Sequence, residues 1–190
     1  MSDRPWRPSP VEVAAAEGRT VPDVIASRLD VLFVGINPGL YSGAVGHHFA
    51  RPGNRFWKAL HGSGFTHRLL GPFEERELVR HGLGITNLVA RATAGAADLS
   101  DRELRDGAAA VRGKVERTRP RFVALLGVGA YRTAFGIPGA TVGPQPQRLG
   151  KARVWVLPNP SGLNAHYQLP ALVDEFGKLR RALSRRDGGG

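Results

Sequence analysis

The strongest constraint on the fold lies in residues 31–57, where a short apolar run leads into a long loop rich in glycine and proline. The run at 31–34 has the length and the β-branched and aromatic character of a buried strand. Glycines and prolines then interrupt any regular element until Phe56 and Trp57 begin a helix. Because ligands in open α/β sheets bind beyond the carboxyl ends of the strands, the pattern predicts a binding site in this loop.

Three further apolar runs predict strands, at residues 83–89, 121–126 and 154–157. Helical patterns separate them, and Ser100 and Glu103 have the spacing of a capping box that begins a helix ending near 119. The other expected helices span residues 11–17, 20–27, 54–61, 74–81, 128–135 and 169–185, while 136–150 is expected to be irregular. This alternation predicts a single α/β domain, with a central parallel sheet of four to five strands and helices on both faces.

The composition narrows the functional classes. A chain of 190 residues can bury its own core, and the absence of cysteine excludes a disulfide framework, a thiolate nucleophile and cysteine-ligated zinc. A cysteine-free chain with no apolar run of membrane-spanning length and no apolar signal core is expected in the cytoplasm, away from the membrane. The net charge of +11 favours a polyanionic partner, of which nucleic acid is the commonest, although a generally basic background is the alternative.

The first polar loop carries an amide, Asn37, an aromatic ring, Phe49, and two adjacent imidazoles, His47 and His48. The loop lacks the phosphate-binding and dinucleotide-binding fingerprints, and adjacent histidines do not easily ligate one metal, so we expect neither cofactor nor metal. An amide is a weak base but can hold a water, which suits a displacement in which the leaving group departs before water attacks. Cleavage of a flipped nucleobase from deoxyribose, with the base stacked on Phe49, fits this chemistry.

Five segments carry a family resemblance. They are GINPG at 35–39, GHHF at 46–49, PGNRFW at 52–57, GITNLV at 84–89 and LPNPSG at 157–162. In this order, and over roughly residues 20–183, the sequence resembles the mismatch-specific uracil/thymine DNA glycosylases, a branch of the uracil-DNA glycosylase superfamily. The resemblance implies a uracil-DNA glycosylase-like α/β fold and a monofunctional enzyme without metal or cofactor. Such an enzyme removes uracil mispaired with guanine and leaves an abasic site in base-excision repair.

The resemblance also implies a partner and a domain division. The partner is double-stranded DNA that contains a mispaired or damaged base, and the protein is expected to act as a monomer associated with the nucleoid. Residues 1–19 are expected to form an arm with a short helix, 20–185 the DNA glycosylase domain and 186–190 a disordered tail.

By motif position, the resemblance assigns roles to eleven residues. Asn37 would hold the attacking water. The base pocket would be lined by Gly35, Ile36, Ser42, His48, Phe49 and Asn87. The DNA-binding wedge loop would comprise Asn159, Ser161, Gly162 and Leu163. Leu163 would fill the gap left by the flipped nucleotide, and Ser161 would contact a phosphate.

Three departures from the family pattern bear on specificity. Ser42 stands where the thymine-removing vertebrate relatives carry alanine, and a polar group near C5 of the base would disfavour a methyl, so uracil is expected to be preferred over thymine. Asn164 and Ala165 stand where some relatives have an arginine after the wedge, which would weaken contact with the opposite strand. At Asn87 some relatives carry lysine or aspartate, so its role as pocket lining or as a second water holder stays open.

Structural interpretations compete with these roles. Asn37 could be a turn former, Phe49 a loop anchor on the core, His48 a structural imidazole and Leu163 a buried loop residue. The basic end of the last helix is typical of a solvated terminus. At the level of function, the alternatives are a glycosylase of the same superfamily for hypoxanthine, xanthine or ethenocytosine, a non-catalytic module that flips and holds lesions, and a nucleoside hydrolase.

Overall fold

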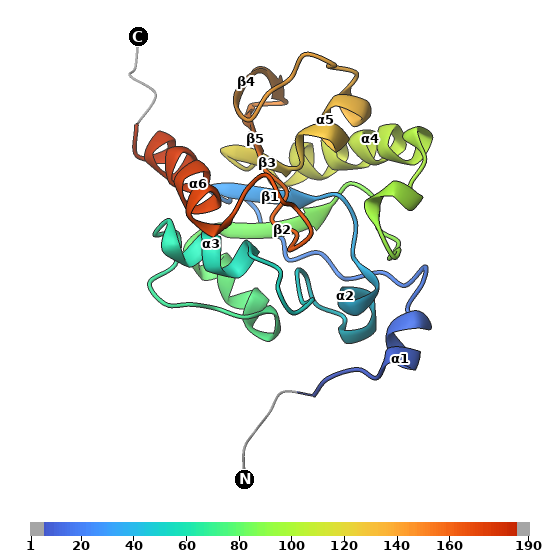
Figure 1. Cartoon of the computed structure of the whole chain (residues 1–190). Coiled ribbons are helices and arrows are strands. Elements are labelled where there is room, and N and C mark those ends of the chain that lie inside the picture. Colours follow the sequence, from blue (N-terminus) through green and yellow to red (C-terminus); the bar gives the residue numbers. More distant parts are fainter. Residues whose placement is uncertain (1–5, 186–190) are drawn as a thin grey trace.

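The computed structural model describes residues 6–185, which build a five-stranded sheet between two layers of helices (Figure 1). The strands are β1 Val31–Gly35, β2 Leu83–Asn87, β3 Phe122–Leu126, β4 Gly143–Leu149 and β5 Ala152–Leu157. Their order in the sheet is β2-β1-β3-β5-β4. Strands β2, β1, β3 and β5 are parallel to one another, and β4 pairs antiparallel with β5. Since β2 and β3 flank β1 on opposite sides, the chain changes direction across the sheet there, and such a switch point opens a crevice at the carboxyl ends of the strands.

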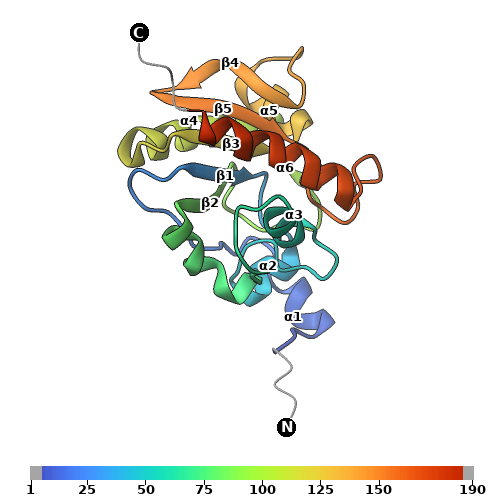
Figure 2. The same cartoon turned by 90° about the vertical axis from the view of Figure 1, so that its left-hand side faces the viewer.

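Helices cover both faces of the sheet, as the view turned by 90° shows (Figure 2). The α-helices are α1 Pro10–Ala14, α2 Leu40–Val45, α3 Phe56–Gly62, α4 Asp101–Thr118, α5 Val128–Phe135 and α6 Leu169–Ser184. Two 3₁₀ segments, η1 Pro72–His81 and η2 Ala96–Asp98, complete the described elements. None of these helices is both long and apolar enough to cross a membrane.

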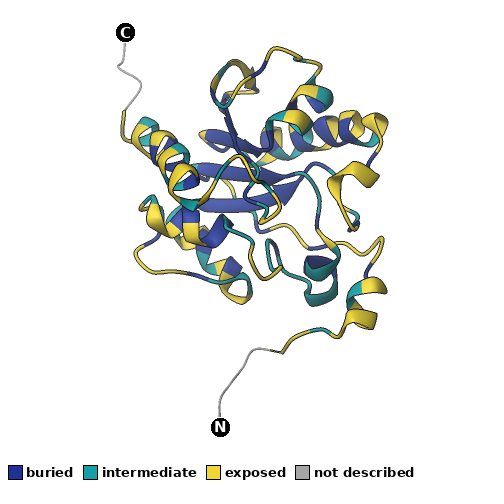
Figure 3. Cartoon of the chain, in the orientation of Figure 1, coloured by how far each residue is buried: buried dark blue, intermediate teal, exposed yellow. Residues whose placement is uncertain are grey.

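Alternate residues of the central strands feed two separate cores, because successive side chains of a strand point to opposite faces. In β1, Val31 and Phe33 pack with α3 and α6, whereas Leu32 and Val34 pack with α4 and α5. All five residues of β1 are buried, and the central strands form the buried interior of Figure 3. A sheet buried on both faces explains why these strands are continuous apolar runs rather than alternating ones.

The predicted fold class is confirmed, and so are most elements. Strand β1, the Ser100–Glu103 capping box that begins α4, and helix α5 lie where the sequence placed them. The predicted helix at 74–81 is the 3₁₀ segment η1. Residues 1–5 and the predicted tail at 186–190 lie outside the described residues.

Three expectations were wrong. Residues 20–27 form no helix; instead Val24 pairs with Ile85 in an isolated antiparallel bridge beside β2. Residues 136–150 contain strand β4 at the edge of the sheet. Its two prolines are untypical of a strand, so the sequence did not predict it, but an edge strand tolerates proline because some of its N–H groups have no partner strand. The first polar loop contains α2, which lies between Gly39 and a left-handed Gly46 (φ 76°).

Candidate active site

A cavity of about 160 Å³ opens at the carboxyl ends of β1, β2 and β5. This is well below the roughly 300 Å³ at which pockets for drug-sized ligands begin, so the space suits a single flat ring. Ten of the eleven site residues predicted from the sequence line it: Gly35, Ile36, Asn37, Ser42, His48, Phe49, Asn87, Asn159, Ser161 and Leu163. The parallel strands bring these distant segments together because their carboxyl ends share one edge of the sheet.

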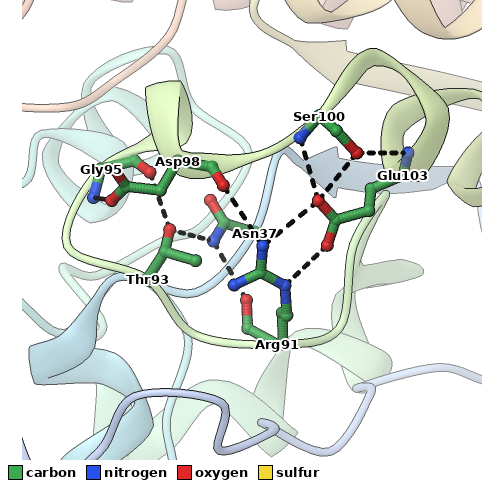
Figure 4. Close-up of polar contacts among 7 residues, drawn as sticks. All are labelled: Asn37, Arg91, Thr93, Gly95, Asp98, Ser100 and Glu103. Atoms are coloured by element: carbon green, nitrogen blue, oxygen red, sulfur yellow. Dashed lines mark hydrogen bonds and ion pairs between the residues drawn. The ribbon is translucent and has the colours of Figure 1, made fainter.

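Asn37 is held by its amide nitrogen. Nδ2 donates to the Thr93 hydroxyl at 2.7 Å and to the Arg91 carbonyl oxygen at 3.0 Å (Figure 4). The Thr93 hydroxyl in turn donates to the carbonyl of Gly95 at 2.7 Å, so it can only accept from Asn37. Both amide hydrogens are therefore used, and Oδ1 is left as the atom that can accept a hydrogen bond from a water in the cavity.

These contacts argue against the interpretation of Asn37 as a turn former. A turn-forming asparagine bonds to backbone two residues away, whereas the partners of Asn37 lie more than fifty residues further along the chain. The segment after β2 also runs beside the Asn37 loop, with hydrogen bonds from Val89 N–H to Ile36 O at 2.9 Å and from Thr93 N–H to Pro38 O at 3.1 Å. The amide is thus fixed by tertiary structure rather than by its own turn.

Phe49 is anchored on the core and also lines the cavity. Its ring stacks on Phe56 with centroids 4.2 Å apart, and it also lines the cavity. Its backbone has φ 51°, a left-handed conformation that costs a residue with a side chain on the order of 1–2 kcal/mol. A Cβ at Gly35 would lie 3.3 Å from Phe49 Cζ and would clash with Asn87 Oδ1, so the cavity depends on glycine there.

His48 is buried, and each polar atom of its ring has a partner. Nε2 lies 2.9 Å from the carbonyl oxygen of Pro22, which can only accept, so the ring proton is assigned to Nε2. Nδ1 then accepts from Asn87 Nδ2 at 3.3 Å. Burial lowers the pKa of His48 below its ordinary value of 6.5, an effect larger than the opposing attraction of Glu75, so the ring is neutral near pH 7. His48 lines the cavity as a structural imidazole that also orients Asn87.

This lowered pKa predicts a pH-dependent stability. The pKa of His48 is lower in the folded state than in the unfolded state. The contribution of neutral His48 to the free energy of unfolding is therefore complete above about pH 6.5 and is lost as the pH falls toward the pKa of His48 in the folded state. We expect the free energy of unfolding in urea to decrease between pH 7.5 and pH 5. The His48→Gln variant, which cannot titrate, should show a shallower decrease, and equal slopes in the two proteins would contradict this assignment.

The buried carboxylate of Glu75 contacts the first polar loop although the sequence does not predict it. Glu75 of η1 accepts hydrogen bonds from the His48 backbone N–H and from His47 Nδ1, both at 2.8 Å. The first polar loop contains no acidic residue of its own, and no spacing connects it to position 75. Since Glu75 does not line the cavity, its role is to fix the two histidines that precede Phe49.

Ser42 of α2 is buried and lines the cavity. Its Oγ accepts a hydrogen bond from the Ala50 N–H at 3.1 Å. The hydroxyl hydrogen therefore remains as a donor, and a polar group is part of the cavity wall.

The loop after β5 is held in shape by its own side chains. Asn159 Oδ1 accepts from the Ser161 N–H at 3.0 Å, and Ser161 Oγ accepts from the Leu163 N–H at 3.3 Å. Asn164 Nδ2 closes the loop with a bond to Asn159 O at 2.9 Å. Leu163 lies at the rim of the cavity with 75% of its surface exposed, which rules out the buried-residue interpretation.

Arg55 ties the loop after β5, residues 159–164, to the start of α3. Its guanidinium donates to the carbonyl oxygens of Asn164 at 3.0 Å, Tyr167 at 2.6 Å and Gly162 at 3.2 Å. Gly162 is the one predicted site residue outside the cavity; a Cβ there would lie 2.8 Å from Gly53 O. Gly162 therefore permits a close approach of two loops, and Arg55 fixes that approach.

The roles of Thr93, Arg55 and Glu75 could not be predicted from the sequence. Each acts on a residue distant in sequence, and only tertiary structure connects them.

In residues 6–185, no group of three or more histidine, aspartate or glutamate side chains is arranged to hold a metal ion.

Comparisons with known proteins identify the family of the chain and its fold. The family model described as the uracil DNA glycosylase superfamily matches residues 22–183. The fold is similar to the solution NMR structure of a proposed uracil DNA glycosylase from Methanosarcina acetivorans, with a TM-score of 0.61 and 18% sequence identity over 88% of this chain and 99% of that one. The match of the family model covers the loops after β1 and β5 and every residue that lines the cavity. The chain therefore belongs to the uracil DNA glycosylase superfamily.

Proposed function

We propose that this protein is a monofunctional DNA glycosylase that removes uracil, chiefly from G·U mismatches, and leaves an abasic site. The observation that carries the proposal is the orientation of Asn37, whose Nδ2 is anchored and whose Oδ1 is left to hold a water beside a ring-sized cavity. The catalytic unit would be residues 20–185 acting as a monomer on double-stranded DNA.

The chemistry of the cavity favours a dissociative hydrolysis. No carboxylate is among the residues that line it, so early removal of a proton from water has no strong base. In the proposed reaction the C1′–N1 bond breaks with both electrons on the base, which leaves as an anion. The water held by Asn37 then bonds to C1′ of the oxocarbenium-like sugar and loses its proton to solvent or to the departed base.

The surroundings of the cavity support recognition of a flipped base. Phe49 offers an aromatic face, and the exposed Leu163 at the rim has the apolar character of a side chain that enters the base stack. The net charge of +11 adds attraction for the phosphate backbone.

Ser42 supports a preference for uracil. Its hydroxyl belongs to the cavity wall, and a polar group there interacts less favourably with the C5 methyl of thymine than with the C5 hydrogen of uracil. One additional methyl group in a binding pocket usually changes the transition-state free energy of two competing substrates by about 1–3 kcal/mol relative to each other.

The proposal is tested by single-turnover release of the base from a panel of duplexes. The panel carries G·U, A·U, G·T and single hypoxanthine, xanthine or ethenocytosine lesions. We expect G·U to react fastest and G·T at least about tenfold more slowly. Faster release of another damaged base would replace uracil as the substrate, and tight binding without release of any base would identify a lesion-binding module.

Loss of the Arg55 side chain is expected to weaken binding of a duplex that contains an abasic-site analogue. Without the hydrogen bonds from Arg55 to the carbonyl oxygens of Gly162, Asn164 and Tyr167, the segment after β5 holds Leu163 less firmly at the rim. We expect Arg55→Met to raise Kd about tenfold, or about 1.4 kcal/mol. Arg180→Met is the control of equal charge change, because Arg180 makes a single bond to Gly64 O away from this loop. Equal effects of the two variants would show that only charge matters.

A further inference from the structure

We propose that the ion pair between Arg91 and Glu103 is a positioning device that fixes Asn37 to the first turn of α4. The inference rests on the proposed function, since it assigns two positioning residues to the water-holding amide. Neither residue lines the cavity, so both would act through Asn37 rather than on the substrate.

Arg91 is bound at both ends. Its backbone carbonyl accepts the hydrogen bond from Asn37 Nδ2 at 3.0 Å. Its guanidinium donates two hydrogen bonds to the Glu103 carboxylate, from Nε to Oε1 at 2.6 Å and from Nη2 to Oε2 at 3.2 Å (Figure 4). Nη2 also donates to the carbonyl oxygen of Asp98 at 3.2 Å. A paired fork of this kind restricts direction as well as distance, so the position of the carbonyl follows from that of Glu103.

Glu103 is itself fixed, because it is the third residue of α4 and closes the capping box. Its Oε2 accepts from the Ser100 backbone N–H at 2.9 Å and from the Ser100 hydroxyl at 3.0 Å, while its own N–H donates to Ser100 Oγ at 3.2 Å. The hydrogen bond from Arg91, followed by that from the Ser100 backbone, lowers the pKa of Glu103 to about 2. The carboxylate therefore stays ionised throughout the pH range in which a DNA duplex is stable.

A second contact holds the same segment against α4. Gly107 of α4 lies so close to the backbone of Leu88 that a Cβ at position 107 would clash with the Leu88 carbonyl. The helix therefore touches the chain just after β2 at Leu88 and again, through Glu103, at Arg91. Two fixed points on one rigid helix define the path of the segment that carries both hydrogen-bond acceptors of Asn37, the Arg91 carbonyl and Thr93.

Loosening this segment would displace the water rather than remove its acceptor. A misplacement of about 1 Å costs a well-oriented reaction up to about a hundredfold in rate. Because Thr93 would still hold one amide hydrogen, we expect a smaller loss, about tenfold, when only the ion pair is removed.

The Arg91→Met variant tests the proposal, because it removes the guanidinium but keeps the backbone carbonyl that Asn37 uses. Single-turnover uracil release is compared for the wild type, Arg91→Met, Asn37→Ala and the double variant. We expect about a tenfold loss from Arg91→Met in the wild-type background and no further loss in the Asn37→Ala background. Arg102→Met is the control, since Arg102 makes an exposed pair with Asp106 on the same helix, 3.8 Å apart, and its loss changes the charge equally.

A second measurement works without catalysis. The side-chain amide protons of Asn37 are identified in ¹H–¹⁵N spectra by their absence in Asn37→Ala, and their exchange with solvent is compared between the wild type and Arg91→Met. We expect at least fivefold faster exchange in Arg91→Met and none of this change in Arg102→Met. Unchanged exchange, or equal rate losses in the two backgrounds of the cycle, would overturn the positioning role. Absence of uracil release by the wild type would instead contradict the proposed function, and the exchange measurement would still decide the positioning.

Discussion

Asn37→Ala is expected to slow single-turnover release of uracil from a G·U duplex by at least about a hundredfold, equivalent to about 2.7 kcal/mol of barrier. The substitution removes Oδ1, the acceptor that the anchored amide offers to water, and leaves the surrounding chain in place. In the proposed reaction the water would no longer be held beside the sugar, and the positioning that makes attack effectively intramolecular would be lost.

The control for this prediction is binding. Asn37 is partly buried in the cavity, whereas Leu163 at the rim is 75% exposed, so Kd for the G·U duplex should change by less than about threefold, or about 0.7 kcal/mol. A variant that binds and also releases uracil at the wild-type rate would show that Asn37 is only a structural residue. Loss of binding and of release together would point to a folding defect, which thermal unfolding of the variant would detect.

Gly35→Ala is expected to have an effect of similar size through the shape of the cavity. The added methyl would lie 3.3 Å from Phe49 Cζ and would clash with Asn87 Oδ1, so the ring and the amide, which both line the space proposed for the base, would have to shift. We expect at least about a fiftyfold loss in single-turnover release, equivalent to about 2.3 kcal/mol. The measurement is the same assay at saturating enzyme, which separates the chemical step from binding.

Gly129→Ala is the matched control for this substitution. Gly129 lies within α5, and a Cβ there would meet no atom within 4 Å. Alanine at this helical position should leave release unchanged and should raise the stability by up to about 1 kcal/mol. Full activity of Gly35→Ala would mean that the base does not occupy the space beside Phe49.

The sequence predicts the sheet and most helices because their signals are local. Four of the five strands are apolar runs, and α4 begins at a capping box whose hydrogen bonds the structure contains. The wrong predictions fall where local signals were weak or misleading. Strand β4 is exposed and contains prolines, and residues 20–27 carry a helical pattern although Val24 is fixed by a bridge to Ile85.

The candidate site divides in the same way. Sheet geometry predicted a site at the ends of the parallel strands, and the family resemblance pointed to its residues in the loops after β1 and β5 because their motifs are contiguous in the chain. The supporting residues could not be predicted, since Arg55 acts on carbonyl oxygens more than a hundred positions away and Glu75 reaches two histidines from a different element. A backbone carbonyl has no sequence signature, so a side chain that binds one is recognised only in the folded structure.

Hydrolytic release of uracil can be observed by mass analysis of the products from a duplex with one G·U pair. We expect free uracil and an unbroken strand whose mass corresponds to replacement of the base by a hydroxyl group. We also expect the Asn37→Ala protein to yield this product at least about a hundredfold more slowly. An intact uracil-containing strand after prolonged incubation with the wild-type protein, under conditions in which the duplex is bound, would mean that the protein does not excise uracil.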